Sequence, residues 1–414
     1  MTIAVDQRSG EAQRNLHQPL RGSHRPALLT LAFRPFFLAA GLWSIVALCL
    51  WVAMLSAGLV LPTRFGPLGW HIHEMLFGFV MAAIAGFLLT AIPNWTQRVP
   101  VNGSPLAVLA GLWLVGRAAC LLSALIPPWL SIAADISFPF ALIVIVAREI
   151  ISAGNWRNLS MIAPISVLGA ANLLMHLEAN GIAVPAGLGW RLGLAATIIL
   201  ISVIAGRIVP TFTGNWLTKR HSPQQSEPLE LPAPHGWVDS AALGSLHAGL
   251  LAWAIVPAFR GVGILLLLAG AINLWRLLRW RGMATVPEPL LLVLHIAYAW
   301  VALGAALLGL TALGFRLPLG AAIHALTVGA IGTMILAMMT RVSRGHTGHA
   351  LSANRMTVVM YLFISLAAIA RVVAGFFGEW LMPLLLISAS LWTAAFALFA
   401  CCYGPMLLRA RQGN

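Results

Sequence analysis

The chain has 414 residues, of which 60% are hydrophobic and only 9% are charged, and its mean hydropathy is +0.90. A soluble globular domain carries roughly 25% charged residues, so this composition excludes an ordinary soluble protein. The net charge of +14 does not indicate nucleic-acid binding, because the basic residues lie in short segments between apolar runs. We therefore expect the lipid bilayer, and no nucleic acid, as a partner.

The first 26 residues are polar and rich in arginine, and we expect them to form a disordered cytoplasmic tail. The apolar run that follows is too long for a cleavable signal segment, so it predicts a membrane anchor. Hydropathy predicts about twelve spans, most of them long enough to cross a hydrocarbon core of roughly 30 Å. They are residues 35–60, 70–95, 105–126, 129–148, 159–178, 188–214, 239–257, 261–280, 287–313, 318–341, 355–376 and 380–405.

This pattern predicts an all-α polytopic membrane protein. Backbone groups in lipid must be hydrogen-bonded internally, and the runs lack the alternation of a β-barrel. We expect a single transmembrane domain over residues 27–408 and a short cytoplasmic tail at 409–414. The polar, proline-rich stretch at about 217–237 is expected to be a cytoplasmic linker between the sixth and seventh helices.

Basic residues are distributed unequally between alternate loops. The loops that we assign to the outside contain Arg64, Arg191, Arg260 and Arg316. Cytoplasmic loops of membrane proteins carry an excess of lysine and arginine, so this asymmetry predicts that both termini are cytoplasmic. The segments assigned to the cytoplasm contain Arg98, Arg148, Arg157, Lys219, Arg220, Arg276, Arg279, Arg281, Arg341, Arg344, Arg355, Arg409 and Arg411.

The second and tenth spans share a weak internal similarity. In each span a histidine precedes a glycine by the same number of residues, and an arginine follows in the next span. Repeated helical units are common in membrane proteins that have a central site, so we expect an internal helical repeat. The matching residues are His73, Gly78 and Arg117, and His324, Gly329 and Arg371.

Several histidines fall within apolar spans, where ionisable side chains are costly and mark cofactors, ion paths or buried pairs. Imidazole is a common ligand of copper and of haem iron. We predict that His71, His73 and His324, which share one membrane face, bind copper or an adjacent haem iron. On an ideal helix His71 and His73 point about 200° apart, so they can share one ion only if the helix begins irregularly near Gly69. Glu74 is expected to orient a ligand histidine by accepting a hydrogen bond.

Two further histidines are predicted as axial ligands of haem: His176, near the outer end of the fifth span, and His295, towards the middle of the ninth. For each of them the alternative is a hydrogen bond to a neighbouring helix, and this is the interpretation that we favour for His247. The four cysteines lie in apolar spans and form no C-x-x-C pair, so we expect neither disulfides nor a thiolate metal site. The sequence contains no P-loop, Rossmann glycine motif, zincin motif or nucleophile elbow.

Three arginines, Arg117, Arg207 and Arg371, lie at depths where a guanidinium group requires an anionic partner. Few carboxylates are available in the spans, so we predict that these arginines hold haem propionates or an anionic substrate. The alternative is that they bind backbone carbonyls or extend to the membrane surface.

Six stretches of the sequence resemble the NnrS family. They are FRPFFLAAGLW, GWHIHEMLFGFVMAAIAGFLLTAIPNWT, ANLLMHLEANG, GRIVPTFTGNW, LHIAYAW and HALTVGAIGTMILAMMTRVSRGHTG. The resemblance covers about Arg34 to Leu408 and implies a bacterial inner-membrane protein of twelve helices, linked to nitric oxide and denitrification metabolism. It implies haem, which we expect to be of the b type, and copper. The histidines that match are His71, His73, His176, His295, His324 and His346, and the motifs do not divide them between the two metals.

The leading hypothesis is therefore a haem- and copper-containing membrane protein that binds or reduces nitric oxide and protects against nitrosative stress. Turnover would make it an oxidoreductase of the nitric oxide reductase type, with an electron donor that the sequence does not identify. The alternative is a secondary transporter, or a non-catalytic sensor, whose polar residues line a substrate path.

Overall fold

The computed structural model describes residues 26–221 and 229–410. The predicted N-terminal tail up to residue 25, part of the central linker and the last four residues lie outside the described residues. The described chain is helical, without strands, and contains 12 helices that are long and apolar enough to cross a membrane. The predicted class, an all-α polytopic membrane protein, is confirmed.

Each membrane-crossing segment overlaps one predicted span. The second segment begins earlier than predicted, at Gly66, and the sixth extends to Arg220, which shortens the linker. Short 3-10 turns flank the segments at Ala27–Leu29, Trp156–Met161, Gly282–Thr285 and Gly378–Trp380. The segments are α2 (Phe33–Ser56), α3–η2–α4 (Gly66–His73, Glu74–Val80, Met81–Thr96), α5 (Gly103–Leu121), α6 (Pro128–Ser152), α7 (Ile162–Ala179), α8 (Leu188–Arg220), α9 (Trp237–Ile255), α10 (Arg260–Leu278), α11 (Pro289–Ala312), α12–η5–α13 (Leu319–His324, Ala325–Gly332, Thr333–Thr347), α14 (Arg355–Ala374) and α15 (Leu381–Leu408).

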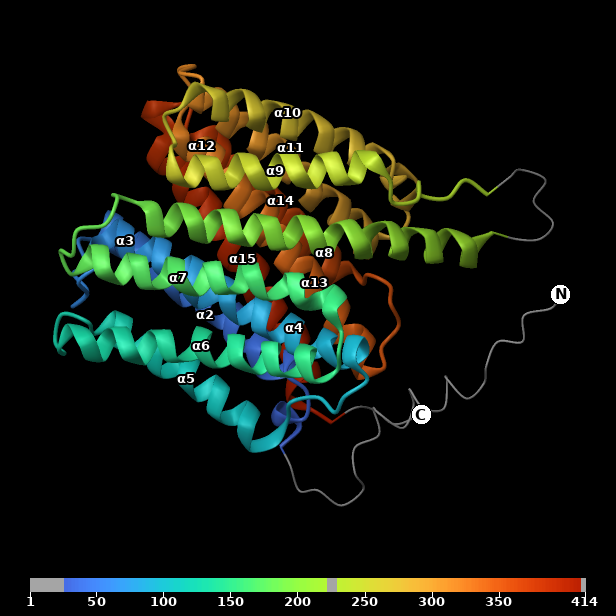
Figure 1. Cartoon of the computed structure of the whole chain (residues 1–414), viewed down its shortest axis with the longest axis horizontal. Helices are drawn as coiled ribbons and strands as arrows, with labels where there is room; N and C mark the ends of the chain where they lie inside the picture. Colours follow the sequence, from blue (N-terminus) through green and yellow to red (C-terminus); the bar gives the residue numbers. More distant parts are fainter. Residues whose placement is uncertain (1–25, 222–228, 411–414) are drawn as a thin grey trace.

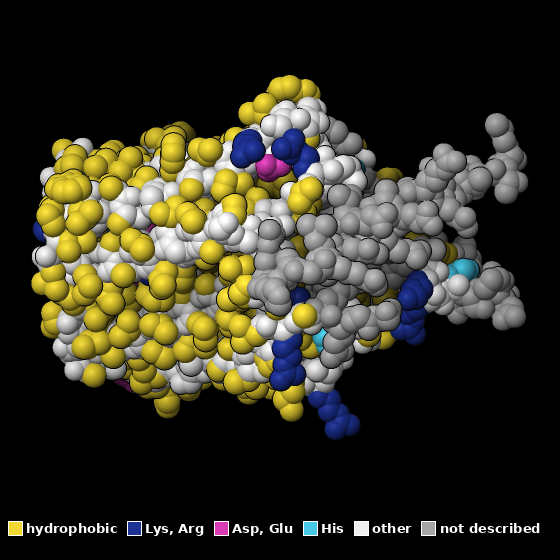
Figure 2. All heavy atoms as spheres, turned by 90° about the horizontal axis from the view of Figure 1, so that it is seen from below, with side chains coloured by type: hydrophobic (Ala, Val, Ile, Leu, Met, Phe, Trp, Pro, Cys, Tyr) yellow, Lys and Arg dark blue, Asp and Glu magenta, His cyan; other side chains and the backbone are white. Residues whose placement is uncertain are grey.

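The helices form one bundle, in which the segments α3–η2–α4, α8, α11 and α12–η5–α13 are the most enclosed. Figure 1 shows α3 and α12 at the same end of the bundle, opposite the end at which α8 terminates. On the face shown in Figure 2, apolar side chains cover most of the surface, and arginine and lysine gather towards the end where α8 terminates. An apolar outer surface is what a bundle embedded in lipid requires, because charged groups are costly there.

The second and tenth segments have the same unusual construction. Each begins as a short α-helix, continues as a π-helix and resumes as an α-helix, and a histidine, His73 or His324, ends the first part. The glycines that the sequence paired also match, because each lets a tryptophan pack against the π-helix. A Cβ atom on Gly78 would lie 2.5 Å from the Trp43 indole, and one on Gly329 would lie 2.5 Å from that of Trp300. The sequence similarity therefore corresponds to equivalent local structure, which supports the repeat.

Candidate functional site

A cavity of about 300 Å³ lies between α2, α3, η2, α8, α12, η5, α14 and α15. Its volume is at the lower end of the range for small-molecule and cofactor sites, and its walls are mostly aliphatic and aromatic, as such sites usually are. Three tryptophans contribute to these walls: Trp51, Trp190 and Trp392. The polar side chains that line it are His71, Thr327, His324, Arg371 and Ser388.

The two histidines of the cavity present nitrogen atoms that are suited to a ligand. The His71 ring stacks on Trp51, with ring centroids 4.1 Å apart, and within the described chain its buried Nδ1 has no hydrogen-bond partner. His324 Nδ1 lies 2.7 Å from the carbonyl oxygen of Gly320. A carbonyl only accepts, so Nδ1 carries the hydrogen and Nε2 keeps a free lone pair. Both side chains can therefore donate an electron pair to a metal.

Arg371 brings a positive charge to the same cavity. Within residues 26–221 and 229–410, no carboxylate or hydrogen-bond acceptor is paired with its guanidinium group. Arg117 and Arg276 differ, since each is paired with a carboxylate, Arg276 with Asp239 at 2.9 Å. An enclosed charge without a counter-ion is unfavourable, so the arrangement suits an anionic group in the cavity.

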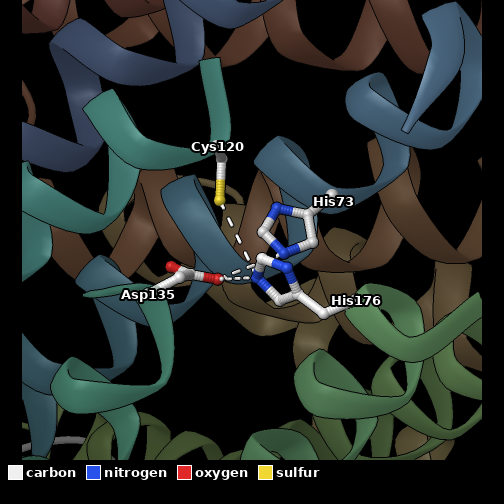
Figure 3. A group of neighbouring side chains, drawn as sticks. All are labelled: His73, Cys120, Asp135 and His176. Atoms are coloured by element: carbon white, nitrogen blue, oxygen red, sulfur yellow. Dashed lines mark hydrogen bonds and ion pairs between the residues drawn. The ribbon is translucent and has the colours of Figure 1, made fainter. Parts of the chain in front are cut away.

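A second polar site lies beside the first one and is completely buried. It consists of His73 on α3, Cys120 on α5, Asp135 on α6 and His176 on α7, whose side chains converge in Figure 3. Both His73 Nε2 and His176 Nε2 face one oxygen, Asp135 Oδ2, at 3.2 and 3.0 Å. Cys120 Sγ lies 4.0 Å from His176 Nε2. We call these four residues the buried cluster.

Three further polar residues hold the buried cluster in place. Glu74 Oε1 accepts a hydrogen bond from His73 Nδ1 at 3.0 Å. Arg117 donates to both oxygens of Glu74 at 2.8 Å and also pairs with Asp135. Asn172 Nδ2 donates to Asp135 Oδ2 at 2.9 Å. The two carboxylates and one guanidinium leave one negative charge, which a proton on His73 or a bound cation can balance.

The structure separates the three histidines that the sequence grouped as copper ligands. The helix begins at Gly66, before Pro67, and runs regularly to His73, so the irregular start near Gly69 does not occur. His71 consequently faces the cavity, together with His324, whereas His73 faces the buried cluster, together with His176. Glu74 supports His73 and not His71.

The spans contain few carboxylates, but His73 and His176 both face one of them, Asp135. The same residue, with Glu74, pairs with Arg117, so this arginine needs no propionate as its counter-ion. Cys120 lies among groups that could hold a metal ion, so a thiol that the sequence did not place in a metal site is available as a ligand here. Several of the predicted residues therefore lie in a site, but in a grouping different from the predicted one.

The remaining predicted residues lie outside both sites. His295 Nε2 lies 3.0 Å from Thr213 Oγ1, and its ring packs edge-on against Trp280. Arg207 is exposed and donates to Asn158 at 3.2 Å. Neither His295 nor Arg207 lines the cavity. The contact of His295 matches the alternative of a hydrogen bond to a neighbouring helix, and the exposure of Arg207 matches the alternative in which it extends to the membrane surface.

Sequence reasoning missed Cys120, Asp135 and Asn172 as members of a site. Each is a single polar residue on its own helix, without a local motif. One signal was available: Asp135 is a carboxylate inside an apolar span, one helix after Arg117, and a buried pair of opposite charges is the least costly arrangement of such residues.

The described chain is a multi-pass membrane protein with twelve apolar helices, several of which line a cavity that contains two imidazoles able to hold a metal or haem iron. The family model described as NnrS protein matches residues 27–411. The chain therefore belongs to the NnrS family, and this membership supports a link to nitric oxide metabolism. No curated protein matches the sequence.

Proposed function

We propose that this protein is a haem- and copper-containing protein of the bacterial inner membrane that binds or reduces nitric oxide and limits nitrosative stress. The observation that carries the proposal is the cavity, in which two histidines with available nitrogen atoms and one arginine without a counter-ion share apolar walls. Family membership supports the same link to nitric oxide.

The residues of the cavity fit a haem group. His71 and His324 would hold the iron, and Arg371 would pair with a propionate. The apolar and aromatic walls match the faces of a porphyrin. When bound, haem supplies an iron atom to which nitric oxide binds readily.

The protein itself would contribute selection of the ligand and exclusion of water. The walls of the cavity favour a small uncharged gas over ions and hydrated solutes. A second, almost wholly apolar cavity of about 70 Å³ lies between α2, α4, α8 and α13 and shares Val80 with the larger one. Apolar cavities of this kind stay dry and accept small apolar molecules. They would give nitric oxide a path from the membrane interior.

The proposal is tested by the optical spectrum of the purified full-length protein, oxidised and reduced, with and without nitric oxide. We expect a Soret band that shifts with the gas and is lost or weakened in His71→Ala and His324→Ala. His247→Ala is the matched control, because this histidine bonds to Ser202 at 2.8 Å, outside both sites. Wild-type protein without haem would overturn the proposal.

Reduction and simple binding are separated by anaerobic turnover of the loaded protein with a reductant and nitric oxide. A secondary transporter is the second candidate, because repeated units with irregular helices at a central site are common in that class, and both α–π–α segments line the cavity. Haem-free protein that moves a solute into liposomes would support the transporter.

A further inference from the structure

We infer that the buried cluster of His73, Cys120, Asp135 and His176 is a binding site for one transition-metal ion of the copper and zinc class, separate from the cavity. The inference deepens the proposed function and rests on it in one respect only, since copper is one of the ions considered. No contact within the cavity is required for it.

The ligand atoms of the buried cluster converge. Four helices each bring one ligand atom to the same point, and these atoms all lie within 4.8 Å of one another. In a tetrahedral site with metal–nitrogen distances of about 2.0 Å and metal–sulfur distances of about 2.3 Å, ligand atoms are separated by roughly 3.3 to 3.8 Å. Small side-chain movements would therefore complete the coordination.

Neighbouring residues already orient the ligand atoms of the buried cluster. Glu74 Oε1 binds His73 Nδ1, which directs His73 Nε2 towards the cluster. Arg117 pairs with one oxygen of Asp135 and leaves the other, Oδ2, directed at both histidines. Metal-binding histidines commonly donate their second nitrogen to a carboxylate in this way.

The charge of the buried cluster also favours a cation. Glu74, Asp135 and Arg117 sum to one negative charge, and the Cys120 thiolate adds another. A divalent cation therefore makes the cluster neutral, as a fully buried site requires. Without metal, protons would balance the negative charge. His73 Nε2 lies 2.8 Å from Asn172 Oδ1, a distance at which a protonated imidazole donates a hydrogen bond. A metal ion would replace these protons.

The class of metal follows from the ligand atoms. Two imidazoles and a thiolate favour copper or zinc, whereas calcium and magnesium require oxygen ligands. Of the four ligands only Asp135 provides oxygen, so calcium and magnesium should bind weakly here.

The test uses purified full-length protein, assayed for copper and zinc by elemental analysis and then, after removal of bound metal, titrated with Co²⁺ as a probe. We expect about one ion per chain and a near-ultraviolet charge-transfer band, because thiolate coordination to cobalt produces such a band. In Cys120→Ser the band should disappear, and in His176→Gln cobalt should bind at least ten-fold more weakly. Cys49→Ser is the matched control, since Cys49 is exposed on α2.

Wild-type protein that binds neither copper, zinc nor cobalt at this stoichiometry overturns the inference, and so does a charge-transfer band that survives in Cys120→Ser. The wild-type titration decides the matter even where a variant does not fold. Failure of the proposed function is distinguishable, because haem is read from the Soret band. His71→Ala and His324→Ala should lose haem and keep the cobalt band, and Cys120→Ser should show the reverse.

Discussion

His71 and His73 are separated by one residue on a regular helix, yet their imidazoles belong to two different sites. His71 stacks on Trp51 beside the cavity, and His73 lies between Glu74 and Asp135 in the buried cluster. Because each residue of an α-helix is rotated by about 100° from the previous one, α3 acts as the wall between the two sites. Substitutions at the two positions should therefore have separable consequences.

Arg371→Gln should weaken haem binding, because it removes the only positive side chain that lines the cavity. A hydrogen bond to a charged group contributes about 1.5–3 kcal/mol, so we expect affinity to fall by roughly ten-fold to a hundred-fold. Titration of haem-depleted protein with haem measures the change. Arg371→Lys should retain part of the affinity. Arg355→Gln, at the exposed start of α14, is the control, and equal losses in both variants would contradict the assignment.

Arg117→Met should destabilise the protein strongly, because it leaves Glu74 and Asp135 buried without their counter-ion. Removal of one partner from a buried ion pair costs about 3–5 kcal/mol. Arg98→Met provides the comparison: Arg98 pairs with Glu149 at 2.6 Å but its side chain is 39% exposed, and such pairs contribute about 0–1 kcal/mol. Unfolding in detergent with increasing denaturant measures both. Similar midpoints for the two variants would count against the buried network.

Gly78→Ala and Gly329→Ala should each destabilise the bundle by about 1–3 kcal/mol, the usual cost of forcing extra atoms into a packed core. The added Cβ would meet the indole of Trp43 in the first case and that of Trp300 in the second. Gly111→Ala is the control, because a Cβ at this position on α5 has nothing within 4 Å. Thermal unfolding in detergent compares them. If the repeat is real, the first two substitutions should have similar effects.

Both ends of the transmembrane domain should face the cytoplasm. They lie together, since Arg34 Nη1 donates to the carbonyl oxygen of Leu407 at 2.9 Å, so they must share one side of the membrane. The distribution of arginine and lysine assigns that side. Green fluorescent protein fused to the C-terminus should fluoresce, and alkaline phosphatase at the same position should be inactive. Inverted results would reverse the topology.

The sequence predicted the helices well because lipid imposes a simple rule: about 20 apolar residues for each crossing. It also indicated His71, His324 and Arg371 as site residues, because ionisable groups in such spans are costly, and the structure places all three in one cavity. It could not predict which helices are neighbours. Cys120 and Asp135 are isolated residues on separate helices, and only their packing against α3 and α7 brings them together in one cluster.

The grouping of His71 with His73 failed for a related reason. The prediction allowed an irregular helix start near Gly69, because glycine adopts non-helical backbone conformations at little steric cost. In the structure the chain turns earlier, at Gly66 with a φ of +66°, and Pro67 then begins a regular helix. Because this turn precedes the helix, the spacing of His71 and His73 places their side chains about 200° apart, in different sites.

The π-helical stretches that follow His73 and His324 have a consequence for how this chain can change. A π-helix contains an extra residue in its turn relative to an α-helix. Loss of one residue from Glu74–Val80 or from Ala325–Gly332 would restore an α-helix and rotate the preceding histidine by about 100° relative to the rest of the segment. The two sites therefore depend on the number of residues in these helices as much as on their identity, and single-residue deletions there should be tolerated far less than most substitutions.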